Sequence, residues 1–371
     1  MRIDVFCDIV DNYGDAGVCW RLVRRLAQTS TSQSLSLTRD FIRLFCNDLE
    51  LLNKLAGGDA KALAQSLNIE ILPWSDCMTG KLPDVVIETF ACELPSEYLH
   101  QLKQQAETIV INLEYLSAES WVDSHHGLPS PSNGLNKYFF FPGFSEASGG
   151  LLQGDLADPD SAPPQSLLKS WALVRAPFLG KRISLFCYET EQMFEFLKDL
   201  DQNGEAVDVL VCFGQAQSLV SHWLNEDFEA GCVLERNQLR LIALPFVSQD
   251  DYDWLLTQCD LNIVRGEDSF VRAQWAGQPF IWQIYHQDDN AHHIKLNAFL
   301  SKYLANANPV ARSAIENAMH GEALSTWFNH LDLMKEQAWA WRNTLCTSHK
   351  DGDLAIKLRT FLKKSTKGGK I

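Results

Sequence analysis

Two carboxylates four positions apart follow the first strand-like run of this 371-residue chain. Asp11 and Asp15 stand in DNYGDAGVCWR, residues 11–21. A plain strand-to-helix turn does not need two carboxylates four positions apart. The stretch also contains Asn12, Tyr13, Gly14 and Gly17. A carboxylate pair can accept a proton or hold a cation. Taken alone, the stretch is better explained by Asp11 as a turn residue and Asp15 as the N-cap of a helix that begins near Gly17.

A second stretch, VRGEDSF, follows the apolar run DLNIV and precedes helix formers. Ser269 is expected to cap this helix and Gly277 to end it. Free N–H groups at such a helix start can hold a phosphate, which Arg265 could neutralise, while Glu267 could accept hydrogen bonds from ribose hydroxyls. An ordinary turn with an acidic first helical turn, here with Asp268, explains the stretch equally well.

Aromatic residues stand at the ends of other expected strands. Phe246 and Tyr252 bracket LPFVSQDDYDWLL, where Gln249 offers an amide to the edge of a flat base and Ser248 is expected to cap a helix. FCYE adds Phe186 and Tyr188. By themselves these rings would be assigned to the core.

The histidine-rich run HQDDNAHH, residues 286–293, has the composition of a metal site but not its geometry. Adjacent residues of a helix point in different directions, so His292 and His293 cannot easily share an ion. A solvated helix start is predicted there, and the histidine pair at 125–126 is interpreted in the same way. No metal site is expected.

The elements that must position these residues alternate along the chain as short β-rich runs and amphipathic helical runs. Such alternation predicts an α/β fold with parallel sheets covered on both sides. The expected strands are 2–10, 41–47, 69–73, 84–90, 108–115 and 137–144, then 182–189, 207–214, 239–246, 260–266 and 279–285. Helices are expected at 324–346 and 352–363 near the end of the chain.

A proline-rich, acidic stretch at 154–166 indicates a domain boundary. The expected parts are domain 1–155, a linker at 156–180, domain 181–345, and a C-terminal helix with a basic tail at 346–371. The shared pattern of both halves predicts two Rossmann-like domains that face each other across a cleft. Ligands of such sheets bind beyond the carboxyl ends of the strands, where both DNYGDAG and VRGEDSF should lie.

Composition narrows the class of protein. A net charge of −15 disfavours direct binding to nucleic acid. The ten cysteines include no CxxC, which predicts reduced thiols and a cytoplasmic protein rather than a disulfide framework. The start MRIDVFCDIV is not of signal-peptide type, and no apolar run is long enough to span a membrane.

Together, DNYGDAGVCWRL, NLEYLSAESWV, HGLPSP, KYFFFPGF, SLFCYE, LPFVSQDDYDWLL and VRGEDSFVRAQWAGQPFIWQIYHQ resemble the bacterial protein-arginine rhamnosyltransferases of elongation factor P, the EarP family. The resemblance runs in the same order from residue 3 to about residue 300. It implies a GT-B fold whose last helix crosses back to the first domain. It also implies inverting transfer of rhamnose from dTDP-β-L-rhamnose to an arginine of elongation factor P, without another cofactor and without a membrane or nucleic-acid partner.

The resemblance also implies roles for single residues. Asp15 falls in the general-base position, with Asp11 as its partner and Asn12, Tyr13, Gly14 and Gly17 in the supporting loop. The thymine pocket falls on Phe186, Phe246, Gln249 and Tyr252, with Tyr188 close by. Contacts to the diphosphate and sugar fall on Arg265, Glu267, Asp268 and Ser269.

Two other functions remain open at this point: a GT-B enzyme with a small-molecule or lipid acceptor, and a noncatalytic module that binds elongation factor P. Glu114, at the end of the strand expected at 108–115, has no role in either description.

Overall fold

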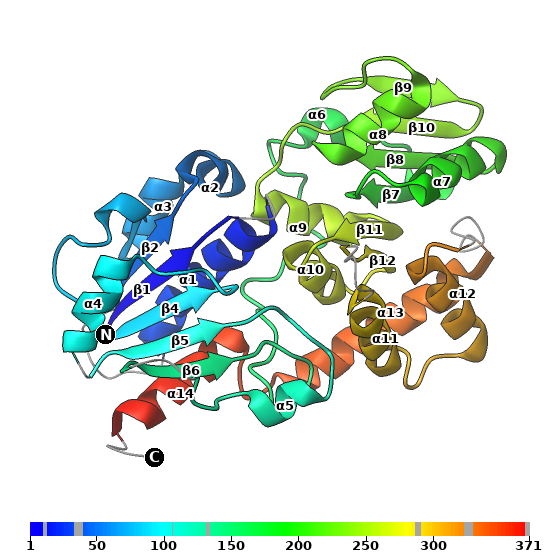
Figure 1. The fold of residues 1–371 in the computed structure, drawn as a ribbon. Helices are drawn as coiled ribbons and strands as arrows, with labels where there is room; N and C mark the ends of the chain where they lie inside the picture. The colour runs from blue at the N-terminus through cyan, green and yellow to red at the C-terminus, as the bar shows by residue number, and fades with distance from the viewer. Residues whose placement is uncertain are drawn as a thin grey trace. The chain divides into compact units, whose positions relative to one another are not determined.

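The computed structural model describes residues 1–9, 13–32, 40–105, 107–130, 134–285, 291–322 and 329–367. Asp11 and Asn12 lie outside these ranges, as does the segment 286–290 of the histidine-rich run. The chain divides into two compact units, Met1–Gly154 with Cys346–Ile371, and Asp155–Leu345 (Figure 1). The expected division into domains 1–155 and 181–345, a linker at 156–180 and a C-terminal part at 346–371 stays a prediction.

The first unit is built on a six-stranded sheet with the strand order β3-β2-β1-β4-β5-β6, in which each described strand runs parallel to its neighbours. Its strands are β1 (Arg2–Cys7), β2 (Phe41–Cys46), β3 (Ile69–Pro73), β4 (Val85–Thr89), β5 (Ile109–Leu113) and β6 (Asn136–Phe140). Its helices are α1 (Gly14–Ser32), α2 (Leu49–Leu55), α3 (Ala60–Ser66), α4 (Ser96–Gln104), α5 (Trp121–His125) and α14 (Leu354–Lys367), with a short 3-10 turn at Trp74–Asp76. Continuous apolar strands suit a sheet that is buried on both faces.

The last helix, α14, completes the core of the first unit. Leu354, Leu358 and Leu362 are fully or almost fully buried in the same cluster as Leu22 and Leu26 of α1. This arrangement confirms the predicted return of the C-terminal helix to the first unit.

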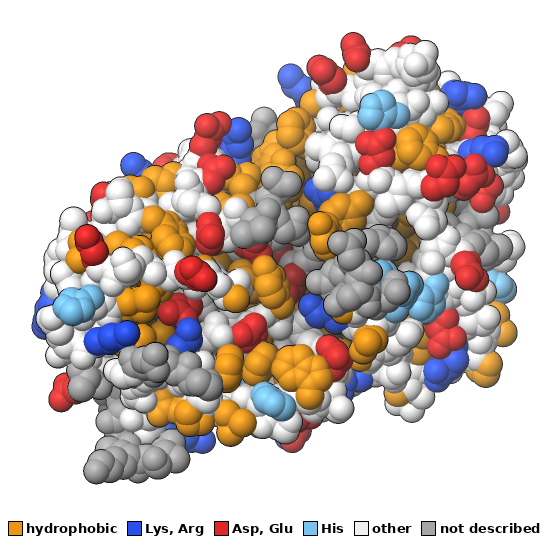
Figure 2. Space-filling view, in the orientation of Figure 1, with side chains coloured by type: hydrophobic (Ala, Val, Ile, Leu, Met, Phe, Trp, Pro, Cys, Tyr) orange, Lys and Arg blue, Asp and Glu red, His pale blue; other side chains and the backbone are white. Residues whose placement is uncertain are grey.

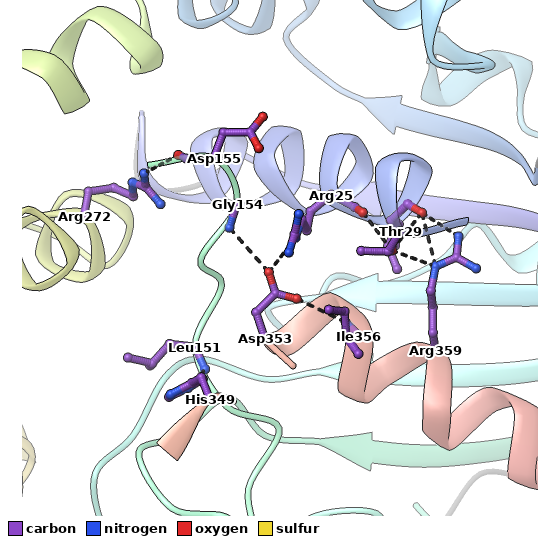
Figure 3. Close-up of polar contacts among 11 residues, drawn as sticks. Arg25, Thr29, Leu151, Gly154, Asp155, Arg272, His349, Asp353, Ile356 and Arg359 are labelled. Atoms are coloured by element: carbon purple, nitrogen blue, oxygen red, sulfur yellow. Dashed lines mark hydrogen bonds and ion pairs between the residues drawn. The ribbon is translucent and has the colours of Figure 1, made fainter. Parts of the chain in front are cut away.

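Polar contacts fasten α14 to α1 (Figure 3). The buried Asp353 accepts hydrogen bonds from Arg25 Nε at 2.7 Å and from the backbone N–H of Ile356 at 3.2 Å. Arg359 Nε donates to Thr29 Oγ1 at 2.9 Å. The helix is therefore held at its first turn and again near its middle.

The second unit has a six-stranded sheet of order β12-β11-β7-β8-β10-β9, in which only β9 runs antiparallel among the described strands. Its strands are β7 (Lys181–Leu185), β8 (Val207–Val211), β9 (Val233–Arg236), β10 (Leu239–Ala243), β11 (Leu261–Arg265) and β12 (Phe280–Gln283). Its helices are α6 (Leu168–Trp171), α7 (Glu191–Gln202), α8 (Gln215–Leu224), α9 (Gln249–Gln258), α10 (Asp268–Ala276), α11 (Ala291–Tyr303), α12 (Pro309–Met319) and α13 (Leu331–Ser348), with a 3-10 turn at Pro177–Leu179. The chain passes back to the first unit within α13.

Several sequence-based bounds were wrong. Strands β1 and β6 end at Cys7 and Phe140, earlier than residues 10 and 144, because the pairing with neighbouring strands ends there. The edge strand β9 was not predicted, since three of its four residues are exposed and carry no alternating apolar pattern.

Candidate functional site

Asp15 lies at the carboxyl end of the first sheet, on the helix that follows β1. Helix α1 begins at Gly14, not near Gly17, so Asp15 stands in its first turn and is not the N-cap. The carbonyl of Tyr13 accepts the first helical hydrogen bond, from Gly17 N–H at 2.9 Å. Asp15 is only 3% exposed. A carboxylate at this end of a helix is stabilised by the helix dipole, which is why the helix can include it.

Short contacts fix α1 against the neighbouring strands. Cys19 Sγ donates to Thr89 Oγ1 at 3.3 Å, and Thr89 Oγ1 donates to the Phe6 carbonyl at 2.7 Å. These bonds join α1 to the ends of β4 and β1, so the backbone of Asp15 is carried on a rigid part of the unit. The position of Asp11 relative to Asp15 lies outside the described residues.

In the second unit, Arg265 ends β11 and lies between two aromatic rings. Its guanidinium carbon is 4.7 Å from the ring centroids of both Phe186 and Tyr188, close enough for cation–π attraction. Arg265 is 7% exposed, and its buried Nη1 has no hydrogen-bond partner among the described residues. A buried guanidinium N–H group without a partner is suited to an anion such as a phosphate oxygen.

The turn after Arg265 differs from the sequence prediction in one respect. Helix α10 begins at Asp268 with Glu267 at the N-cap position, so Ser269 is not the cap. The Ser269 hydroxyl instead donates to the carbonyl of Arg265, one helical turn back. Gly266 has a φ of 67°, which lets the chain turn sharply from β11 into α10. The predicted end of this helix at Gly277 is confirmed, with a φ of 71°.

Gln249 and Tyr252 stand on α9, beside the start of α10. The predicted cap of α9 is confirmed, because the Ser248 side chain accepts a hydrogen bond from Asp251 N–H. Gln249 Nε2 donates to Asp268 Oδ2 at 2.9 Å, which ties the two helix starts together.

The rings predicted to hold the base take part in two separate ring contacts. Tyr252 packs against Phe186 with ring centroids 5.7 Å apart, and its buried hydroxyl has no partner among the described residues. Burial raises the pKa of Tyr252 well above its ordinary value, so it stays a neutral hydrogen-bond donor. Phe246 packs against Phe213 at 5.9 Å.

Two residues that support the surroundings of Arg265 were not predicted from the sequence. Gln283, the last residue of β12, accepts a hydrogen bond from Tyr188 N–H at 2.6 Å and donates to Thr190 Oγ1 at 3.1 Å, and so fixes the backbone of the residue that covers Arg265. Tyr285 packs edge-on against Tyr188 at 5.8 Å. Only the side-by-side order β12-β11-β7 brings these residues together, and that order cannot be seen along the sequence.

The cysteines, the potential metal ligands and the lengths of the helices bear on three of the expectations from the sequence. All ten cysteines are free thiols, and only Cys232 and Cys346 are exposed. His292 and His293 have ring centroids 4.2 Å apart, but no group of three or more potential metal-ligating side chains occurs in the described ranges. Within those ranges, every helix is too short or too polar to cross a bilayer.

Comparison with known proteins finds similar sequences over almost the whole chain. Residues 3–363 match the family model for the elongation-factor P (EF-P) rhamnosyltransferase EarP. A protein-arginine rhamnosyltransferase of Pseudomonas putida is 42% identical over 354 residues, covering 91% of this chain and 88% of that protein. One from Neisseria meningitidis serogroup B is 36% identical over 339 residues, covering 86% and 85%.

Solved structures are also similar to this chain. One that describes EarP-mediated arginine glycosylation of translation elongation factor EF-P is similar with a TM-score of 0.64 at 31% identity, covering 98% of this chain and 99% of that one. Arabidopsis thaliana UGT89C1, solved with UDP-L-rhamnose, is similar in fold alone, with a TM-score of 0.54 at 9% identity over 98% of this chain and 99% of that chain. The predicted GT-B fold with two Rossmann-like units is thereby confirmed.

Proposed function

Because this chain belongs to the EarP family of elongation factor P rhamnosyltransferases, we propose that it moves L-rhamnose from dTDP-β-L-rhamnose to an arginine side chain of elongation factor P, with inversion at the anomeric carbon. In this proposal the second unit binds the donor and the first unit receives the arginine. Since the acceptor is a translation factor, the reaction takes place in the cytoplasm.

Arg265 is the observation that best supports the donor half of the proposal. Its buried Nη1, which has no hydrogen-bond partner in the described part of the chain, lies next to the start of α10, where backbone N–H groups and the helix dipole also favour negative charge. The diphosphate binds there, and Glu267, Asp268 and Ser269 contact the ribose and the sugar. Phe186, Phe246, Gln249 and Tyr252 hold the thymine, with Tyr188 covering Arg265 from the other side.

Asp15 supports the acceptor half. A guanidinium has a pKa above about 12 and a carboxyl a pKa of about 4, so full deprotonation before the reaction would cost on the order of 11 kcal/mol. Asp15, with Asp11 as its partner, therefore grips the guanidinium, orients one nitrogen toward the anomeric carbon, and accepts a proton only as the new bond forms. Asn12 and Tyr13 support this geometry together with Gly14 and Gly17, although the last two belong to the first turn of α1 and not to a loop as predicted.

The bond changes balance within one displacement. The arginine nitrogen forms a bond to C1 of rhamnose from the face opposite the diphosphate, and the bond from C1 to the diphosphate oxygen breaks. The electron pair leaves with dTDP, whose growing charge is stabilised by Arg265 and the start of α10. The proton goes to Asp15. We propose that the reaction needs no cofactor, and retained turnover in excess chelator would support this.

The direct test is incubation with purified elongation factor P and dTDP-rhamnose, followed by intact mass measurement. Addition of one deoxyhexose to one arginine is expected, and NMR of the product should show the α-anomer. Asp15→Asn should lower kcat by at least about a hundredfold while the dissociation constant for dTDP stays unchanged. Near-normal turnover of Asp15→Asn would remove Asp15 from the chemistry.

The remaining alternatives make different predictions. An enzyme with a small-molecule or lipid acceptor would be stabilised by dTDP but would leave elongation factor P unmodified. A noncatalytic binding module would bind the factor, transfer no sugar and show no rise in melting temperature with dTDP.

A further inference from the structure

Glu114 is a half-buried carboxylate that follows the carboxyl end of β5. Asp15 follows the carboxyl end of β1 in the same sheet. Residues two apart on a strand share a face, so Glu114 lies above Asn112. Asn112 Nδ2 donates to Glu114 Oε1 at 2.7 Å, and this bond fixes the carboxylate. Asn112 pairs in register with Glu88 of β4.

Lys137 acts on Glu114 through its charge, while it forms an ion pair with another carboxylate. Lys137 of β6 is ion-paired with the buried Glu88, at the same face of the sheet. Burial raises the pKa of Glu114 above its ordinary value, while the Asn112 bond and the charge of Lys137 lower it. The carboxylate is thus positioned by an amide and left with one side toward solvent.

Asn112 provides an independent sign that something binds here. Its side chain is 7% exposed, and its buried Oδ1 accepts no hydrogen bond from any described residue. Buried carbonyl oxygens are almost always paired in folded proteins. A ligand that carries N–H donors and no acceptors would satisfy both this oxygen and Glu114.

An aromatic face adjoins the carboxylate. Tyr115 is 40% exposed and stacks on Phe90, with ring centroids 4.6 Å apart and planes at 20°. Phe90 and Ala91 have φ values of 55° and 57°, an uncommon conformation for non-glycine residues, at the carboxyl end of β4. This turn directs the Phe90 ring against Tyr115 and so keeps the Tyr115 ring in place.

Two more exposed hydrophobic side chains follow Tyr115 in the sequence. Trp121 of α5 is 41% exposed and Leu128 is 48% exposed. Figure 2 shows hydrophobic side chains gathered over the region of α5. A protein partner, which has both apolar and charged side chains, suits this surface better than a small molecule.

We propose that Glu114 and Tyr115 bind a second basic side chain of the acceptor protein, next to the arginine that is modified. Arginine or lysine supplies N–H donors to Glu114 and Asn112 and a cation to the face of Tyr115. Strands β1 and β5 flank β4, so their ends lie about 10 Å apart at about 4.8 Å per strand, too far for one guanidinium to bridge. The inference rests on the proposed function.

The test compares wild-type enzyme with Glu114→Gln, which keeps the size of the side chain and removes its charge. The KM for elongation factor P should rise about tenfold or more, with kcat and the KM for dTDP-rhamnose nearly unchanged. The matched control is Glu119→Gln, a half-buried carboxylate that accepts a hydrogen bond from Ser117 Oγ at 2.9 Å on the same loop. This control should behave as wild type.

Tyr115 gives a second variant that does not depend on buried polar groups. Tyr115→Leu should raise the KM for the acceptor, whereas Tyr115→Phe, which keeps the aromatic face, should not. The dissociation constant for elongation factor P, measured by calorimetry without donor, should follow the same order for all four variants.

An unchanged KM and dissociation constant in Glu114→Gln would overturn the inference, and so would a loss confined to kcat. The proposed function fails separately: wild-type enzyme that binds elongation factor P through Glu114 but transfers no rhamnose would contradict the transfer reaction and leave this subsite standing.

Discussion

At the scale of single residues, Arg265 unites charge, shape and burial in one side chain. Its planar guanidinium lies between Phe186 and Tyr188, and its Nη1 is not hydrogen-bonded to any residue that the structure describes. A lysine ammonium carries the same charge but cannot stack between two rings or bind a phosphate with two parallel bonds. The identity of the side chain, not only its charge, should therefore matter.

Arg265→Lys is expected to raise the KM for dTDP-rhamnose about tenfold to a hundredfold, the effect of losing a charge-assisted hydrogen bond. Steady-state kinetics and titration with dTDP measure this change. Arg236→Lys is the control, because Arg236 also lies over a ring, that of Trp223 at 5.0 Å, but far along the sheet at the edge strand β9. A similar loss in both variants would mean that Arg265 acts through packing alone.

The ion pair of the buried Glu88 with the half-buried Lys137 leads to a prediction about pH. Burial raises the pKa of Glu88, and Lys137 pulls it back down. Without Lys137 the folded-state pKa rises further above that of the unfolded chain. In the unfolded chain Glu88 then releases its proton at a lower pH than in the folded chain. The free energy of unfolding therefore falls as the pH rises from the unfolded-state pKa to the folded-state pKa of Glu88, and it is regained on acidification.

Lys137→Met should lower the free energy of unfolding by about 3 kcal/mol near neutral pH, because it leaves a buried charge unpaired. The deficit should shrink as pH falls and Glu88 takes up a proton. Urea unfolding across a pH series measures both. Lys198→Met, which breaks an exposed pair with Glu195, should change stability by less than about 1 kcal/mol at any pH. A deficit in Lys137→Met that grows on acidification would contradict this account.

At the scale of elements, the parallel strands could be predicted because they are short, continuous apolar runs between turn formers. The place of Arg265 at the carboxyl end of a strand could be predicted in this way, whereas the roles of Phe186 and Phe246 followed only from the family resemblance and stay predictions. The start of α1 could not be predicted in the same way. Two glycines and an acidic residue have the composition of a turn, yet Asp15 also suits the first turn of a helix.

Side-chain contacts between neighbouring strands could not be predicted from the sequence, for a different reason. Gln283 and Tyr188, or Glu88 and Lys137, are brought together by strand order and register. The N-cap of α10 was predicted at Ser269, two residues after its observed place at Glu267, since a serine can either accept from a helix N–H group or donate to a carbonyl one turn back.

The confirmed cap of α9 gives the element-scale prediction. Ser248→Ala should lower the free energy of unfolding by about 1 kcal/mol, because an N–H group at the helix start loses its partner. Thermal unfolding measures the loss. Ser120→Ala is the control, since Ser120 stands at the N-cap position of α5 without a side-chain cap bond. Equal losses in the two variants would show that the cap bond contributes nothing.

At the scale of the whole molecule, the first unit is assembled from both ends of the chain. Its core contains Leu354, Leu358 and Leu362, which follow the entire second unit in the sequence. The second unit, Asp155–Leu345, is contiguous. The second unit can therefore complete its core before the chain ends, whereas the first cannot.

Leu358→Ala should lower the stability of the first unit by about 2–5 kcal/mol, because a fully buried leucine leaves a cavity against α1. Hydrogen exchange should then show faster exchange in β1, β4 and α1, with exchange in β7, β8 and β11 unchanged, since local stability follows the unit that loses the contact. Lys364→Ala, on the exposed side of α14, should leave both sets of strands as protected as in wild type. If exchange rose equally in both units, the two would unfold as one cooperative body, and the last helix would stabilise the whole chain rather than the unit it packs in.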